Sequence, residues 1–219
     1  MFPLLFIFEF ILLFFLAKLL SRSLMKVFLK ATKSTKVSIY LISLFFLPGV
    51  IVHELSHFLT AGVLFVKTGD IDILPKTVDG GLRLGSVQTE RTDFIRMALI
   101  GVAPVIIGSV IVFGTIYYIQ NNSFNSFLAY LISFFVILEV GNTMFSSKKD
   151  IEGTFTLFVA LILIFLVILF FNPSILTYLG NLFSSQNAQE IFKKGDLFLL
   201  MPLLMDIALI VFLRLVGGR

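Results

Sequence analysis

Two histidines and a glutamate give the clearest chemical signal in the sequence. His53, Glu54 and His57 read H-E-x-x-H, and the chain has no other histidine. Residues four apart on a helix share a face, so both imidazoles can bind one zinc ion while Glu54 acts on the water that the ion activates. The alternative is two core histidines beside a stray acid, but composition rarely places all three residues at this spacing. The pattern therefore predicts one zinc ion per chain.

A catalytic zinc site usually takes a third protein ligand and leaves one position for water. The chain has no Cys, so the third ligand must be a carboxylate. Five acids lie within or next to an apolar run: Glu9, Glu139, Asp150, Glu152 and Asp206. If the run around residue 140 stays helical as far as Asp150, then Asn142, Ser146 and Asp150 share one face. The other interpretation of this polar stripe is hydrogen bonding between helices and a solvated helix end.

The elements that must position these residues are apolar. The chain is 58% hydrophobic and 14% charged, with a mean hydropathy of +1.04, which excludes a water-soluble fold. The net charge of +4 suits a bilayer surface better than nucleic acid. A span takes about 20 residues, and we expect six, over 2–20, 37–66, 94–119, 127–145, 155–171 and 197–216. The sequence thus predicts an all-α, multi-pass integral membrane protein forming one domain over 1–219, with its catalytic core at about 37–153.

Three connections have patterns of their own. Pro48 and Gly49 interrupt the run that contains the histidines, which predicts a kink or break there. Residues 67–93 alternate apolar and polar side chains around Asp79 and Gly80, which predicts a β-hairpin after the second span. Residues 21–36 are basic and fit either an amphipathic helix or a solvated loop.

The order of the motifs resembles the site-2 protease family of intramembrane zinc metalloproteases, in its compact prokaryotic form. An H-E-x-x-H in a span is followed two spans later by Asn142 and, eight residues on, by Asp150. The family's second motif usually reads N-x-x-P-x-x-x-x-D-G, whereas here Phe145 replaces the Pro and Ile151 replaces the Gly. Ala61, four residues after His57, fits the family's extension of the first motif.

The resemblance implies zinc held by His53, His57 and Asp150, with Glu54 as general base. It implies that Asn142 donates a hydrogen bond to the substrate backbone or the developing oxyanion, and that transmembrane protein substrates are cut in or near their spans. It also implies that an extended substrate adds a strand to the hairpin. The expected membrane depth also favours Asp150 as the third zinc ligand. On a straight helix Glu139 would lie roughly 16 Å deeper in the membrane than Asp150, so we expect Glu139 to be a packing or supporting acid.

Two other functions use the same residues. The first is a metal-binding transporter or scaffold without hydrolysis, and the second is a membrane hydrolase that cuts a non-peptide bond. Glu54 favours a hydrolase, because a transport site needs no general base beside its ligands. The expected partners are the lipid bilayer and membrane-protein substrates, without nucleic acid.

Overall fold

The computed structural model describes the backbone at residues 2–73, 76–78, 81–83, 85–121, 127–145 and 148–217. Within these ranges it describes the side chains, except those of residues 2–3, 76–78, 81–83, 120–121, 148–154, 156–157 and 216–217. The described chain is mostly helical, as predicted. Its elements are α1 (Phe2–Thr32), α2 (Thr35–Phe45), α3 (Leu47–Val63), β1 (Thr68–Asp72), β2 (Lys76–Val78), β3 (Gly81–Arg83), β4 (Ser86–Thr89), α4 (Phe94–Asn121), α5 (Phe127–Thr143), α6 (Lys148–Phe171), α7 (Ser174–Ser184) and α8 (Gln186–Gly217).

Several helices are long and apolar enough to cross a membrane. In the described chain, α1, α4 and α8 meet this condition alone. The pairs α2–α3 and α6–α7 meet it together, with bends of 68° and 117°, so the number of such spans is between three and five. α5 is apolar but has 17 residues. The prediction of several apolar spans is therefore confirmed, whereas the predicted number of six is not.

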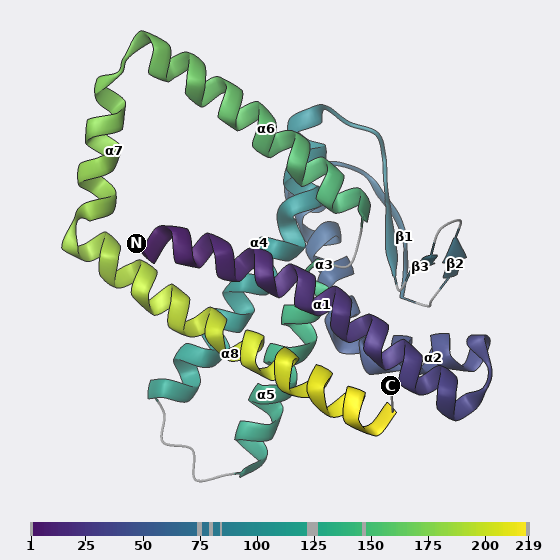
Figure 1. Cartoon of the computed structure of the whole chain (residues 1–219). Helices are drawn as coiled ribbons and strands as arrows, with labels where there is room; N and C mark the ends of the chain where they lie inside the picture. The colour runs from purple at the N-terminus through teal and green to yellow at the C-terminus, as the bar shows by residue number, and fades with distance from the viewer. Residues whose placement is uncertain are drawn as a thin grey trace.

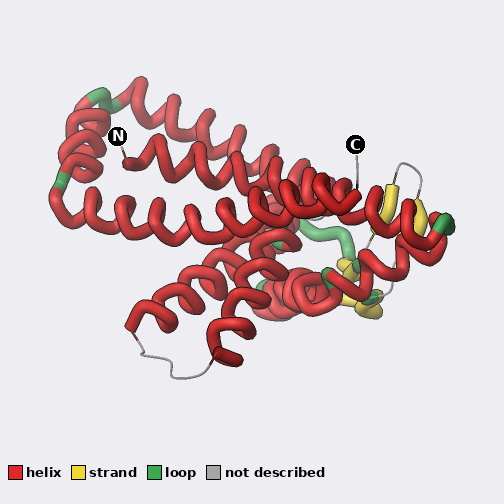
Figure 2. The backbone as a smooth tube through the Cα atoms, turned by 60° about the horizontal axis from the view of Figure 1, so that its bottom comes forward, coloured by secondary structure: helices red, strands yellow, loops and turns green. Residues whose placement is uncertain are grey.

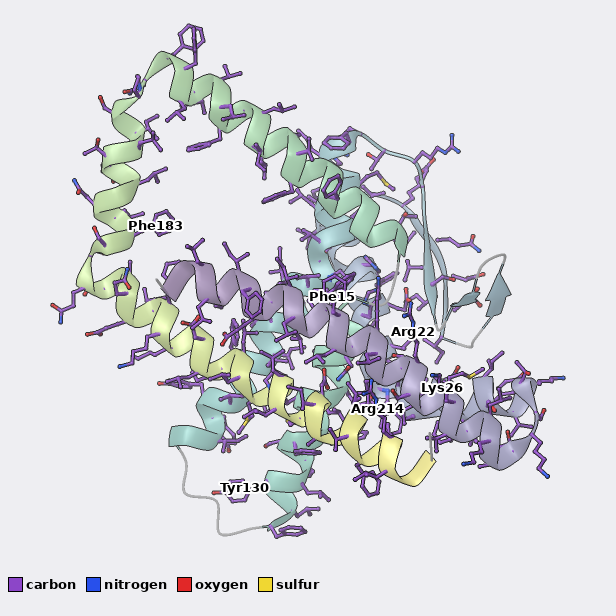
Figure 3. The ribbon with its side chains drawn as sticks, viewed as in Figure 1. Phe15, Arg22, Lys26, Tyr130, Phe183 and Arg214 are labelled. Atoms are coloured by element: carbon purple, nitrogen blue, oxygen red, sulfur yellow. The ribbon has the colours of Figure 1, made fainter. Side chains whose placement is uncertain are left out.

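The first and last helices lie side by side and run in the same direction (Figures 1 and 2). Near their beginnings, the rings of Phe6 and Phe192 are 6.1 Å apart. Further along, Leu13 packs with Leu199 and Leu203 in one cluster. Arg22 and Lys26 of α1 then lie at the same end of the pair as Arg214 of α8 (Figure 3). The two termini therefore lie at opposite ends of this pair.

The core lies where six helices meet. Buried side chains of α1, α2, α3, α4, α5 and α8 form its largest cluster in the described chain, which includes Leu20, Ile42, Val50, Ile116, Leu138 and Met205. By contrast, α6 and α7 extend away from the bundle (Figure 1), and most of their described side chains are exposed. Such apolar surfaces are typical of helices that face lipid.

The helix break before the histidines occurs as predicted, but it lies slightly earlier. α2 ends at Phe45, and α3 begins at Leu47 with Pro48 in its first turn. Proline is favoured at this position because its missing N–H would have no partner there and its ring fixes a helical φ. The break therefore makes α3 a separate helix that carries the H-E-x-x-H motif.

The predicted hairpin is confirmed and consists of two antiparallel pairs. β1 pairs with β4 from Thr68↔Thr89 to Asp72↔Ser86, and β2 pairs with β3 further out. The predicted turn residues Asp79 and Gly80 lie outside the described residues. Both β1 and β4 contact α3, so the hairpin packs against the helix that carries the histidines.

The helix that carries Asn142 does not continue as far as Asp150, so the condition for a shared face is not met. α5 ends at Thr143, a turn follows at 144–145, and a new helix begins at Lys148. Asn142 and Asp150 therefore belong to different helices, and Ser146 lies outside the described residues. Because the helix is interrupted, straight-helix geometry no longer gives the separation of Glu139 from Asp150.

Candidate metal centre

The two motif histidines face each other in the interior. They lie on consecutive turns of α3, with 2% of His53 and 7% of His57 exposed. Their Nε2 atoms are 3.2 Å apart, and their rings are nearly perpendicular at 84°. Zinc–nitrogen bonds of 2.0–2.1 Å in a tetrahedral site hold two nitrogens about 3.3 Å apart. The pair therefore has the spacing that one zinc ion requires.

A backbone contact fixes the orientation of His57. Its Nδ1 lies 2.8 Å from the carbonyl oxygen of Ile100 in α4. A carbonyl can only accept, so Nδ1 carries the proton and donates it. In the neutral ring Nε2 then holds the lone pair that a metal needs. The close approach of α4 is helped by Ala61, which is fully buried and packs with Ile100.

The start of α4 is also fixed. Asp93 precedes its first residue, and Asp93 Oδ1 accepts a hydrogen bond from the backbone N–H of Arg96 at 3.0 Å. This hydrogen bond lowers the pKa of Asp93. Asp93 thus acts as an N-cap for the helix that supplies the Ile100 carbonyl.

Glu54 lies on α3 beside the hairpin rather than toward lipid. It is 5% exposed. A Cβ built on Gly85, the residue before β4, would lie 2.6 Å from Glu54 Oε1 and 2.8 Å from Val50 Cγ1. Only glycine therefore allows the chain to pass so close to this carboxylate. The hairpin and the expected general base are in direct contact.

The described side chains provide two candidate zinc ligands but no third. No group of three His, Asp or Glu side chains in the described part of the chain could hold a metal ion. Glu9, Glu139 and Asp206 are described, and none of them joins the two histidines in such a group. The backbone of Asp150 lies in α6, which packs against α4, but its side chain lies outside the described residues, as does that of Glu152.

Glu139 has a structural role at the other end of α3. Its Oε2 accepts from the backbone N–H of Gly49 at 3.4 Å. Phe46, the N-cap residue of α3, gives no side-chain cap, so a carboxylate from α5 takes that place. Gly49 permits the contact, because a Cβ there would lie 2.5 Å from both the Glu139 carbonyl oxygen and Thr143 Oγ1. The sequence prediction of a packing or supporting acid fits this position.

Asn142 pairs with an acid that sequence reasoning left without a role. Its Nδ2 donates to Asp206 Oδ1 at 2.7 Å and to the Leu138 carbonyl oxygen at 2.9 Å. Asp206 comes from α8 and is completely buried. Its only sequence signal was an acid within an apolar run, which indicates a polar partner but does not identify it.

Comparison with known proteins gives no match: no family model, curated protein or solved structure is significantly similar to this chain. The resemblance to site-2 proteases therefore rests on the two motifs alone. Beyond these motifs, the evidence for a function is the geometry of α3 and its neighbours.

Proposed function

We propose that the chain is a membrane-embedded zinc metalloendopeptidase that cleaves the spans of other membrane proteins. One observation carries the proposal: the 3.2 Å separation of the two Nε2 atoms, with His57 oriented by the Ile100 carbonyl. The Ile100 carbonyl keeps the proton of His57 on Nδ1, which directs the Nε2 lone pair toward His53 Nε2; the same 3.2 Å approach allows a hydrogen bond between the two rings when no metal is bound.

The donor set suits zinc. Imidazole nitrogens are common zinc ligands, and the third ligand of the proposal is the Asp150 carboxylate, one zinc ion per chain. When bound, zinc supplies a Lewis acid that polarises a peptide carbonyl and acidifies water.

Glu54 is the proposed general base. It takes one proton from the attacking water as the oxygen bonds to the peptide carbon, and it returns a proton to the amine as the C–N bond breaks. Its burial beside Gly85 keeps bulk water from the carboxylate, and its place next to His53 in α3 keeps it near the metal ligands. A purely metal-storing protein would have no use for this acid.

The hairpin suggests how the substrate is presented. β1 and β4 pair with each other, and within the described residues neither pairs with a further strand. An extended peptide can add to such an edge through backbone hydrogen bonds. Because a helix hides its peptide bonds, this pairing would hold an unwound substrate beside Glu54.

The test combines metal analysis with a cleavage assay on a panel of single-span proteins. Glu54→Gln is expected to keep zinc and lose cleavage, whereas His53→Ala and His57→Ala are expected to lose both. Glu190→Gln, at an exposed acid of α8, is the matched control and should retain both. Full cleavage by Glu54→Gln would reject Glu54 as the general base and with it the proposed mechanism. Zinc binding by a wild type that cleaves nothing on the panel would favour the transporter or scaffold.

A further inference from the structure

The paired helices α1 and α8 are longer than the hydrocarbon core of a bilayer is thick. α1 has 31 residues and α8 has 32, so each is about 46–48 Å long at 1.5 Å per residue. The hydrocarbon core is about 30 Å thick. Because the apolar run of α1 ends at Leu20, its excess length consists of residues 21–32. This end of the pair therefore extends to the depth of the lipid headgroups.

Basic side chains gather at this end of the pair, which we call the basic end. Its members are Arg22, Lys26 and Lys30 of α1, Lys33 and Lys36 at the turn into α2, and Arg214 of α8, and all six are exposed. The α1 members are spaced by four residues and share one side of the helix, away from the buried Leu20 and Leu24. Figure 3 shows the α8 member at the same end.

No acid accompanies these charges in the described structure. Along the sequence, no Asp or Glu occurs between Glu9 and Glu54, and none occurs after Asp206. Ion pairs with described acids are absent at Arg22, Lys26, Lys33, Lys36 and Arg214. The basic end therefore carries a net positive charge that the described protein does not neutralise.

The opposite end of the same helix pair carries charges of both signs. Its exposed lysines, Lys193 and Lys194 of α8, lie within four residues of Glu190, and Glu9 and Asp196 are buried nearby. Anionic phospholipids are concentrated in one leaflet of a cell membrane. The difference in charge between the two ends therefore matches the difference between the two leaflets.

Exposed apolar side chains lie among the charges of the basic end. Leu29 is exposed on α1, and Val37 and Tyr40 are exposed on α2. A soluble anion would leave these side chains in water, whereas the acyl chains of a lipid lie directly beneath its headgroup. Neighbouring exposed basic and apolar groups are typical of helices at a membrane surface, so they favour a lipid over a soluble anion.

From this arrangement we propose that the basic end binds anionic phospholipid headgroups, whose phosphates neutralise its unpaired charges. Guanidinium and ammonium groups donate charge-assisted hydrogen bonds to phosphate oxygens. Bound lipids hold the ends of α1 and α8 in the anionic leaflet. This lipid binding is independent of the peptidase function, and each can be tested without the other.

The experiment measures which lipids surround each end of the pair. The chain has no Cys, so one fluorophore can be attached at Val37→Cys near the basic end or at Ile191→Cys near the opposite end. The full chain is reconstituted in phosphatidylcholine vesicles that contain either quencher-labelled phosphatidylglycerol or quencher-labelled phosphatidylcholine. Phosphatidylglycerol should be enriched about threefold or more at residue 37 and less at residue 191. Equal quenching by the two lipids at residue 37, or equal enrichment at both positions, would overturn the proposal.

Two double variants, both made in the Val37→Cys background, identify the residues involved. Arg22→Gln with Lys26→Gln should lose most of the enrichment, because each charge near a membrane surface contributes up to about fivefold. Lys193→Gln with Lys194→Gln is the matched control, since it removes the same charge from the opposite end and should leave the enrichment unchanged. Enrichment that survives the first change, or disappears with the second, contradicts the assignment to the basic end.

A measurement on the chain without these charge changes does not depend on how the variants fold. Raising the salt concentration from about 0.1 M to 1 M shortens the Debye length from about 10 Å to 3 Å, and it should remove most of the enrichment. Enrichment that does not respond to salt would exclude an electrostatic contact with headgroups. Displacement of labelled phosphatidylglycerol by inorganic phosphate at constant ionic strength would make a soluble anion the ligand, which also overturns the proposal.

Discussion

A methyl group added at Gly85 should disable the proposed general base, Glu54, without removing the proposed metal ligands. The Cβ of Gly85→Ala would lie 2.6 Å from Glu54 Oε1 and 2.9 Å from Glu54 Cγ. Ordinary contacts begin near 3.4 Å, so the carboxylate or the hairpin must move by almost 1 Å. A misplacement of about 1 Å can cost roughly 100-fold in rate, and overpacking typically costs about 1–3 kcal/mol of stability.

The assay compares kcat, zinc affinity and unfolding for Gly85→Ala and a control, Gly62→Ala. Gly62 lies on α3, and a Cβ there would meet nothing within 4 Å. The control should keep its activity and gain stability, since alanine is a better helix former than glycine by about 1 kcal/mol. For Gly85→Ala we expect kcat to fall 10- to 100-fold with zinc affinity within about threefold of wild type. Wild-type kcat in Gly85→Ala would refute the contact between hairpin and base.

Three further predictions follow from other contacts. Gly49→Ala should push α3 away from α5, because its Cβ would lie 2.5 Å from Glu139 backbone oxygen; chemical denaturation should show a loss of about 1–3 kcal/mol, and an unchanged midpoint would contradict this packing. Asp150→Ala should lose zinc, whereas Glu139→Ala should keep zinc and lose stability. Zinc titration of equally folded proteins checks this, and loss of zinc by Glu139→Ala but not by Asp150→Ala would make Glu139 the ligand. Reporter tags on the two termini should react with an impermeant label on opposite sides of sealed vesicles, since α1 and α8 run parallel. Labelling of both tags on the same side would exclude an odd number of membrane crossings.

Local patterns predicted the parts of the site that lie close together in the sequence. The spacing of His53 and His57 gave one helical face, and the Nε2 atoms do converge. Pro48 predicted the break that starts α3, and the alternation after residue 67 predicted the hairpin. Each of these depends on interactions within a few residues, which is why the sequence alone was sufficient.

Contacts between distant helices could not be predicted in this way. The predicted span ended at residue 145, but the polar residues 146–150 fit a solvated continuation of the helix as well as a break, so the pattern did not decide whether the helix reached Asp150. An isolated acid such as Asp206 indicates a partner, but the choice of Asn142 depends on how α8 crosses α5. The parallel direction of α1 and α8 depends on how many of the helices between them cross the membrane completely. Hydropathy could not give this number, because it does not show where an apolar run bends.

The pairing of the first helix with the last has a consequence for biosynthesis. Residues 33–185 are made between the end of α1 and the start of α8, which takes about ten to thirty seconds at usual rates of translation. During this time the buried acid Glu9 and the apolar residues Leu13 and Leu20 of α1 lack the α8 surface that covers them in the finished protein. A chain truncated before residue 186 would keep both histidines but leave this surface and Asn142 uncovered. Membrane quality-control proteases should therefore remove the truncated chain much faster than the complete one.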